Sequence, residues 1–353
     1  MRKNRESESK GEKLFEQVKK ILEKEGAKGW KLAQEALLKQ KTKNKQLQEA
    51  INYTILEGKP DFFRPAFVSL CCKAVRGNPK VTIPCGASLV LFSRAIGIHD
   101  DVIDNSKKRN KRLTLFGKFG KNIALILSDI FLFKGFALMR KSIEIGIPQQ
   151  SLVQILDVID RIWFEQGEGE VIEIEAKRQI NTSPQECIAK IKMRASELEA
   201  IARIGGILGG GSQKEIEALG RFGRHLGTMS ILREEIIDML ETNVLKHRIQ
   251  YESIPLPLIY VMKDSKAKTQ ITSVIFKKKL TNTDLWTISN LSDKVGGISY
   301  VSGQIYTIRK QAVSHLGSLQ TENMELQLLA NSLLMKCRYP MPALRCLRRP
   351  VIP

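Results

Sequence analysis

The stretch GIHDDVIDNSKKRNKRLT, residues 97–114, places three aspartates directly before a run of lysine and arginine residues. In a helix, Asp100 and Asp104 lie one turn apart and project the same way, whereas Asp101 is rotated by about 100°. Carboxylates this close repel one another unless a cation lies between them, and magnesium is a hard cation that prefers oxygen ligands. Because Arg109 follows the acidic residues, the stretch predicts a helix end that binds a diphosphate through metal ions.

An isolated acidic pair at this spacing is more often a solvated helix end than a metal site. A second acidic group occurs in LREEIIDML, however, and repeats the acid-acid-x-x-acid spacing. Two such helices facing each other across a bundle could clamp one diphosphate through bridging metal ions. The candidate metal ligands are therefore Asp100, Asp101, Asp104, Glu234, Glu235 and Asp238.

The composition of the 353 residues is that of a folded globular protein, with 42% apolar and 27% charged residues. The formal net charge of +20 favours anionic partners, such as nucleic acid, an acidic membrane surface or phosphorylated small molecules. Nucleic acid is disfavoured because the basic run flanks acidic residues and no aromatic residues interleave with it. The 6 cysteines have neither a paired spacing nor the density of a disulfide-rich domain, which indicates reduced thiols.

Helical periodicity dominates the sequence, and alternating strand patterns are scarce. We expect helical structure over about 11–56, with a break at Gly26–Gly29, and helices over 66–74 and 85–104. Pro- and Gly-rich joints separate these segments. The pattern predicts an all-α bundle with one core.

Two later helices begin with capping signals. Ser183 precedes Pro184 and Glu186, and Ser212 stands three residues before Glu215, which predicts a capping box at both places. Glycines at helical spacing inside the second of these helices predict that a neighbouring helix approaches closely; they are Gly220, Gly223 and Gly227.

We expect a single domain over 13–335, preceded by a disordered polar tail over 1–12 and followed by a basic, proline-containing tail over 336–353. The N-terminus has no apolar core after its charges, so it does not resemble a secretory signal, and a cytoplasmic location is expected. The apolar stretch NIALILSDIFLFKGFALM contains Asp129 and Lys134 and falls short of the roughly 20 apolar residues that span a bilayer. We interpret it as a buried helix.

Five segments follow one another from Gly58 onward: GKPDFFRP, HDDVID, FGKFGKNIALILSDIFLFKGFALM, FGRHLGTMSILREEIID and SIPLPLIY. In this order they resemble segments of the trans-isoprenyl diphosphate synthases. HDDVID is similar to the family's first aspartate-rich motif, and the segment with LREEIID occupies the place of the second. GKPDFFRP looks like the family's Gly-Lys-x-x-Arg-Pro segment with two extra residues. Such order and spacing are hard to reach by chance.

The resemblance implies the helical bundle of the isoprenoid (terpene) synthases, built around a central cavity, and head-to-tail prenyl transfer. An allylic prenyl diphosphate would lose its diphosphate, and the double bond of isopentenyl diphosphate would attack the resulting carbocation before a proton is lost. The implied cofactor is Mg²⁺, with Mn²⁺ as the alternative, held by the six acidic residues. Arg109 would neutralise the allylic diphosphate, while Lys59 and Arg64 would bind isopentenyl diphosphate.

Several positions depart from the family's pattern, mostly on the acceptor side. Asn110 and Ser93 stand where the family has an arginine and a histidine that belong to the isopentenyl diphosphate site. Arg194 replaces a lysine and keeps its charge, so it remains a catalytic candidate. Two glutamates replace aspartates in the second motif, which matters because magnesium tolerates little departure from octahedral geometry. Lys246 completes the substrate-binding candidates.

Three functions are compatible with these departures. An active synthase could compensate with nearby basic residues, namely Lys107, Lys108, Lys111 and Arg112. Alternatively, the protein could pass the prenyl cation to another acceptor or cyclise it, or it could be a weakly active or non-catalytic subunit that modulates a partner synthase. The resemblance implies a homodimer, with a heteromer as the alternative, and the basic C-terminal tail could contact an anionic membrane.

Product length is expected to depend on residues in the turns that precede Asp100. Ala95 and Ile96 lie one turn before it, and Phe92 lies two turns before it. The small side chain of Ala95 leaves room for a growing chain, and the ring of Phe92 could form a floor beyond it. The expected product is therefore a short or medium isoprenyl diphosphate, C15–C25 in length, with C20 as the best fit.

Overall fold

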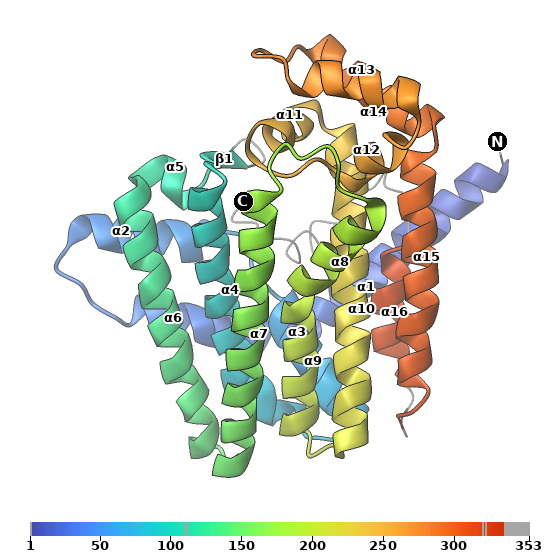
Figure 1. Cartoon of the computed structure of the whole chain (residues 1–353). Helices are drawn as coiled ribbons and strands as arrows, with labels where there is room; N and C mark the ends of the chain where they lie inside the picture. Colours follow the sequence, from blue (N-terminus) through green and yellow to red (C-terminus); the bar gives the residue numbers. More distant parts are fainter. Residues whose placement is uncertain (1, 110–111, 320, 322, 335–353) are drawn as a thin grey trace.

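The computed structural model describes residues 2–109, 112–319, 321 and 323–334, and these form a bundle of helices (Figure 1). The elements are α1 (Arg2–Leu38), α2 (Lys45–Ile55), α3 (Phe63–Ala74), the short 3-10 helix η1 (Pro79–Thr82), α4 (Ile83–Ile103), β1 (Lys108–Arg109), β2 (Arg112–Leu113), α5 (Leu115–Phe119), α6 (Lys121–Glu144), α7 (Gln149–Glu175), α8 (Pro184–Arg194), α9 (Ser196–Leu208), α10 (Gln213–Leu240), α11 (Thr242–Tyr251), α12 (Leu256–Val261), α13 (Ser265–Ile275), α14 (Asn282–Lys294), α15 (Gly297–Leu316) and α16 (Met324–Ser332). β1 and β2 form a small antiparallel hairpin. The all-α prediction is confirmed.

The long helices stand side by side and form the body of the bundle (Figure 1). α4 packs along α6, α10 packs against α9 and α15, and α3 packs against α1 and α9. Helices α11 to α14 lie over the end of the bundle at which α4 and α10 terminate. Because each acidic motif lies at the end of one of these two helices, folding brings both motifs to the same end of the molecule.

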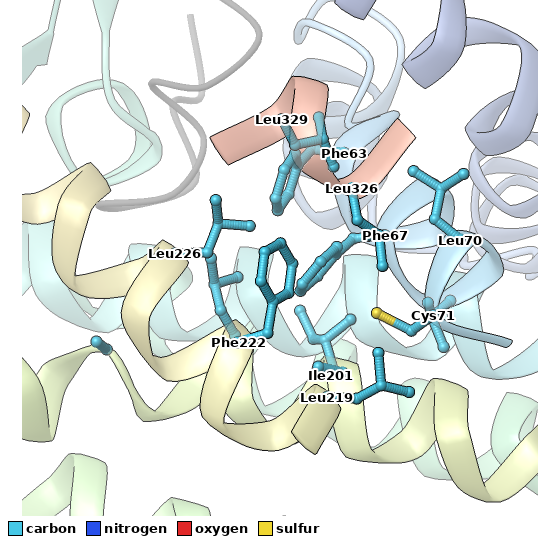
Figure 2. Close-up of a cluster of buried hydrophobic side chains, with 14 of the residues drawn as sticks. Phe63, Phe67, Leu70, Cys71, Ile201, Leu219, Phe222, Leu226, Leu326 and Leu329 are labelled. Atoms are coloured by element: carbon cyan, nitrogen blue, oxygen red, sulfur yellow. The ribbon is translucent and has the colours of Figure 1, made fainter. Parts of the chain in front are cut away.

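The main apolar core lies between α3, α9, α10 and α16 (Figure 2). Phe63 and Phe67 of α3 stack with their ring centroids 5.5 Å apart, and Phe67 lies 6.3 Å from the ring of Phe222 in α10. Ile201 of α9 joins them. Burial of each such side chain contributes about 1.5–3 kcal/mol, so this core fixes α3 and, with it, the backbone of Arg64.

Two further clusters hold the helices around the acidic motifs. One joins α1, α2, α4 and α6 and includes Trp30, Leu91 and Phe131. The other joins α11 to α14 and includes Leu258 and Ile288. The first of these clusters therefore fixes α4, and the other fixes the helices that lie over the end of α10.

The predicted helix break at Gly26–Gly29 is wrong. Both glycines lie inside α1, which continues to Leu38. A Cβ atom at Gly26 would lie 2.1 Å from the carbonyl oxygen of Phe62, and one at Gly29 would lie 2.5 Å from Cβ of Pro65. These glycines therefore let the start of α3 approach α1, a contact between distant segments that periodicity does not reveal.

Both capping boxes are present as predicted, at Ser183 and Ser212. The close approach predicted for the glycines of α10 is confirmed too, because a Cβ atom at Gly223 would lie 2.3 Å from the carbonyl oxygen of Leu198 in α9. The cysteines in the described residues are free thiols. α1 begins at Arg2, inside the segment expected to be a polar tail, and the basic C-terminal tail lies outside the described residues.

By length and composition, two described helices are apolar enough to cross a membrane, but their surroundings differ. In the one that contains α4, 83% of the most apolar window is buried, as in a core helix. In α6 this share is 39%, so the prediction of a fully buried helix is only partly right. α6 and its neighbour α7 expose large apolar side chains, which we call the α6–α7 apolar face: Ile126, Phe133, Phe136, Leu156 and Phe164.

Candidate active site

The first acidic motif lies at the carboxyl-terminal end of α4. Asp104 is the C-cap, and Asn105 adopts a left-handed conformation with φ of 53°, so the chain turns directly after the motif. Asp100, Asp101 and Asp104 are all buried. Burial of several carboxylates is costly unless they pair with or bind positive charge. This helix end is therefore suited to a cation.

Arg109 reaches back from β1 to the motif. Its Nε donates a hydrogen bond to Oδ1 of Asp101 over 2.5 Å. The structure thus places Arg109 beside the acidic residues, where a diphosphate bound to them would lie. The next two residues, Asn110 and Lys111, lie outside the described residues, so the expectation for Asn110 stays a prediction.

The remaining basic residues of the run have different surroundings. The guanidinium of Arg112 stacks over the ring of Tyr53 at 3.9 Å and donates to the carbonyl oxygens of Tyr53 and Glu57. These contacts attach the hairpin to α2 and its C-terminal end. Lys107 and Lys108 are exposed. The sequence suggested that Arg112 could replace a missing anion ligand. In the structure its guanidinium binds Tyr53 and Glu57 instead.

The second acidic motif lies near the end of α10, and its three carboxylates are buried as well. Arg248 of α11 donates to Oε1 of Glu235 over 3.0 Å and to Oδ2 of Asp238 over 2.7 Å, and its Nε lies 3.2 Å from Oε2 of Glu252. The backbone N–H of Leu256 donates to the other carboxylate oxygen of Glu235 over 2.8 Å. An arginine that no motif marks thus lies against the second acidic group.

The charges around Arg248 extend to α7. Burial acts to lower the pKa of Arg248, but the carboxylates around it, Glu235 first, raise that pKa overall. For Glu173, burial acts to raise the pKa, but the guanidinium groups of Arg194 and Arg248 and the hydroxyl of Ser253 outweigh it and hold the pKa below its usual value. Glu173 and Arg248 are therefore both ionised at neutral pH.

A pocket lies beside this cluster, between α7, α8, α10 and α12. Its lining includes Glu173, Cys187, Lys190, Arg194 and Glu235. Arg194, the last residue of α8, lies 3.7 Å from Oε1 of Glu173. Burial raises the pKa of the Cys187 thiol to about 12, so this thiol is protonated and weakly nucleophilic at neutral pH. The pocket has lysine and arginine side chains on α8 and carboxylates on α7 and α10.

The segments that flank the two motifs touch each other. Oγ of Ser106, which follows the first motif, lies 3.0 Å from Nε2 of His247, which directly precedes Arg248. Thr114 anchors the same loop, because its hydroxyl donates to the carbonyl oxygen of Ser106 over 2.7 Å. The loop that follows α4 and the helix that follows the second motif are therefore in direct contact.

The two candidate ligands of isopentenyl diphosphate, Arg64 and Lys59, have different surroundings. The guanidinium of Arg64 is buried between two carboxylates, with Nη1 donating to Asp61 over 2.8 Å and Nε donating to Glu197 of α9 over 2.6 Å. Lys59 is exposed, and its carbonyl oxygen accepts a hydrogen bond from Arg94 over 2.6 Å. An external diphosphate would have to displace the carboxylates that hold Arg64.

Two other substrate-binding candidates differ in accessibility. Ser93 is buried on α4, and its hydroxyl has no hydrogen-bond partner among the described residues. Lys246 is half-buried on α11. Their roles in binding stay predictions.

Phe92 fills the space between α4, α6 and α7. Its ring centroid lies 4.8 Å from that of Phe136 and 5.7 Å from that of Trp163. Ala95, by contrast, packs into the cluster that joins α4 to α6, and Ile96 is half-buried. The ring of Phe92 is therefore placed where it could limit the length of a growing chain, whereas Ala95 belongs to the packing between α4 and α6. The effect of all three residues on product length stays a prediction.

The six acidic candidates do not form a ready-made metal cluster. Within the described part of the chain, no three His, Cys, Asp or Glu side chains are arranged as a metal site. Glu235 and Asp238 instead contact Arg248. The expectation that the second motif binds metal does not fit this arrangement, because the guanidinium already supplies the positive charge.

The first motif fits a metal ion better. Asp100 and Asp104 are one helical turn apart and project from the same side of α4. Their carboxylate oxygens are the donors that magnesium and manganese prefer. Arg109 neutralises part of the charge of Asp101, and the oxygen donors of Asp100 and Asp104 have the chemistry that a hard cation prefers.

The polyprenyl synthetase family model matches residues 44–289. The chain belongs to the polyprenyl synthetase family. It is 26% identical over 199 residues to a geranylgeranyl diphosphate synthase of Methanosarcina mazei, covering 56% of this chain and 60% of that protein. It is 28% identical over 207 residues to an octaprenyl diphosphate synthase of Escherichia coli, covering 58% and 61%. The matched region thus spans about three fifths of these curated relatives.

Solved structures show that the fold of this polyprenyl synthetase extends over most of the chain. A geranylgeranyl pyrophosphate synthetase of Pyrococcus horikoshii superposes with a TM-score of 0.80 at 23% identity, covering 93% of this chain and 99% of that one. A polyprenyl synthase of Caulobacter crescentus, complexed with calcium and isoprenyl diphosphate, gives 0.79 at 17% identity, covering 91% and 98%. The expected terpene-synthase type of helical bundle is confirmed.

Several residues in this site carry no recognisable signal in the sequence. Arg248 and Glu197 belong to no motif, and they meet the acidic and basic candidates only in the fold. Asp61 had a weak signal, because it lies inside GKPDFFRP, three residues before Arg64 and next to the start of a helix.

Proposed function

We propose that this polyprenyl synthetase condenses an allylic prenyl diphosphate with isopentenyl diphosphate to a C15–C25 product, with C20 as the best fit. One observation carries the proposal. The buried carboxylates at the end of α4 lie beside Arg109, and Ser106, which follows them, contacts His247 of α11. Negative ligands for a cation and a positive ligand for phosphate oxygens therefore occur together, as a leaving diphosphate requires.

The chain's own residues would bind the departing diphosphate and hold the metal ion. In the reaction the allylic carbon–oxygen bond breaks, the double bond of isopentenyl diphosphate forms the new carbon–carbon bond, and a proton is lost. Arg109 would bind oxygens of the departing diphosphate. Asp100 and Asp104, with Asp101, would hold Mg²⁺ or Mn²⁺, which supplies further positive charge there. The Caulobacter crescentus structure, which is complexed with calcium and isoprenyl diphosphate, supports the use of a divalent ion with this class of substrate.

The proposal is tested by incubating the protein with allylic diphosphates of several lengths, Mg²⁺ and labelled isopentenyl diphosphate, and then separating the products. Label should enter a longer isoprenyl diphosphate, and Asp100→Ala should lower the rate by at least about 100-fold. Asp129→Ala, an acidic residue on α6 outside the motif, is the matched control and should keep the wild-type rate. Wild-type elongation that Asp100→Ala leaves unchanged would contradict the assignment.

The clamp on Arg64 favours a second candidate function. Because Asp61 and Glu197 already neutralise this guanidinium, the chain could use another acceptor, or cyclise the cation, or act as a subunit that modulates a partner synthase. Release of diphosphate without incorporation of label would support another acceptor or cyclisation. Activity that requires a partner subunit would support the modulating role; a relative in Arabidopsis thaliana is named a heterodimeric geranylgeranyl pyrophosphate synthase large subunit.

We also propose that the protein acts in the cytoplasm. We propose further that a second copy of this chain covers the α6–α7 apolar face. Phe133 of α6 and Phe164 of α7 are each 77% exposed, which is unusual for large apolar side chains on two neighbouring helices. A homodimer would bury them on both subunits at once.

A further inference from the structure

Arg248 is enclosed by carboxylates at the second acidic motif. Its side chain is 2% exposed. Nη1 and Nη2 both donate to Oε1 of Glu235 over 3.0 Å, Nη1 also donates to Asp238 over 2.7 Å, and Nε lies 3.2 Å from Glu252. A buried guanidinium with this many anionic contacts is fixed in place, since withdrawing it would leave several buried charges uncompensated.

Both carboxylate oxygens of Glu235 are engaged by protein donors. Oε1 of Glu235 accepts two N–H groups of Arg248, and Oε2 accepts the backbone N–H of Leu256 over 2.8 Å. Both oxygens of this carboxylate are therefore turned toward protein donors. A divalent cation placed next to them would also face the positive charge of the guanidinium at close range, where repulsion in a buried site is strong.

We propose that Arg248 is the resident cation of the second acidic motif, and that metal ions in this protein are held by the first motif alone. Glu235 and Asp238 are then structural partners of Arg248, and the motif contributes to holding α11 and α12 against α10. The claim about the first motif rests on the proposed function, whereas the assignment of Arg248 rests on its own contacts.

A thermal-stability measurement in EDTA separates the two views of Glu235. If the second motif were an empty metal site, Glu235→Gln would relieve repulsion between carboxylates and raise the melting temperature. If Arg248 is the resident cation, the same substitution breaks a buried ion pair and should lower the melting temperature by roughly 3–6 °C. Glu35→Gln removes an exposed ion pair with Lys39 and is the matched control, with no expected shift. An increase for Glu235→Gln would overturn the assignment.

Mn²⁺ titration followed by electron paramagnetic resonance, with inorganic diphosphate present, tests the metal itself. Asp104→Asn should lose bound Mn²⁺, and Glu235→Gln should bind as much as the wild type. Arg248→Met should gain Mn²⁺ if it folds, because the carboxylates are then released. Loss of an ion in Glu235→Gln, comparable to that in Asp104→Asn, would refute the proposal.

The outcomes also separate this inference from the proposed function. If the wild type binds no Mn²⁺ under these conditions while Glu235→Gln is destabilised in EDTA, the metal assignment of the first motif fails and the assignment of Arg248 stands. If Asp104→Asn and Glu235→Gln each lose an ion and the wild type elongates allylic diphosphates, the proposed function stands and Arg248 is not the resident cation.

Discussion

Nε of Arg64 donates to Oε1 of Glu197 over 2.6 Å, although the two residues are 133 positions apart in the chain. Nη2 of the same guanidinium lies 3.2 Å from the second oxygen of Glu197, so the contact is a two-point one of the kind that arginine forms with carboxylates. Arg64 is a candidate ligand of isopentenyl diphosphate. In that role, Arg64 would bind the diphosphate in competition with the carboxylate of Glu197.

Weakening this clamp should improve binding of the acceptor. Glu197→Gln removes a negative charge but keeps an oxygen that accepts a hydrogen bond, so Arg64 stays in place with more of its charge available. We expect the KM for isopentenyl diphosphate to fall about 3- to 10-fold, or about 0.7–1.4 kcal/mol, with a smaller change in kcat. Glu217→Gln, which removes an ion pair with Arg203, should leave KM unchanged. A higher KM in Glu197→Gln would show that the carboxylate assists binding.

Removal of the aromatic ring at position 92 should lengthen the products. In Phe92→Ala the space between α4, α6 and α7 opens, because this ring fills it against Phe136 and Trp163. Product chromatography should show a shift toward longer isoprenyl diphosphates. Phe131→Ala makes an equal deletion in the cluster behind α4 and should cost about 3–5 kcal/mol of stability without a change in product length. Unchanged products in Phe92→Ala would exclude the ring as a floor.

Charge on the α6–α7 apolar face should prevent self-association. The double variant Phe133→Asp/Phe164→Asp places carboxylates on a surface that a second copy is expected to cover. Light scattering should report a dimer for the wild type and a monomer for the variant. Trp286→Asp changes an equally prominent exposed aromatic residue, 67% exposed on α14, and should remain a dimer. A monomeric wild type would reject the proposed surface.

Acid should destabilise the protein partly through Glu173. Its pKa in the folded protein lies below the ordinary value of 4.5, so its carboxylate stabilises the fold above that value, and this contribution is lost as the pH falls through the lowered pKa. We expect the melting temperature of the wild type to fall more steeply below about pH 4.5 than that of Glu173→Gln. Glu144→Gln, which removes an exposed pair with Arg140, should follow the wild type, because exposed pairs contribute little. Parallel curves for wild type and Glu173→Gln would contradict this account.

The sequence by itself determined the local features of this protein. Helical periodicity, the capping signals at Ser183 and Ser212, and the spacing of the two acidic motifs are all properties of a few consecutive residues, and the structure confirms the helices and caps. The position of Arg109 has a local cause too, since the chain turns at Asn105 directly after the motif and brings Arg109 back to Asp101.

Tertiary structure alone decided which charges meet. Arg248 reaches Glu235 because α11 folds back over the end of α10, and Glu197 reaches Arg64 because α9 packs against α3. From the sequence, Gly26 was predicted to break a helix; in the structure it lies inside α1 and lets the start of α3 approach closely. Each contact joins residues whose separation in the chain carries no periodic signal. The packing of helices, not local preference, therefore placed Arg248 against the second acidic motif and Glu197 against Arg64.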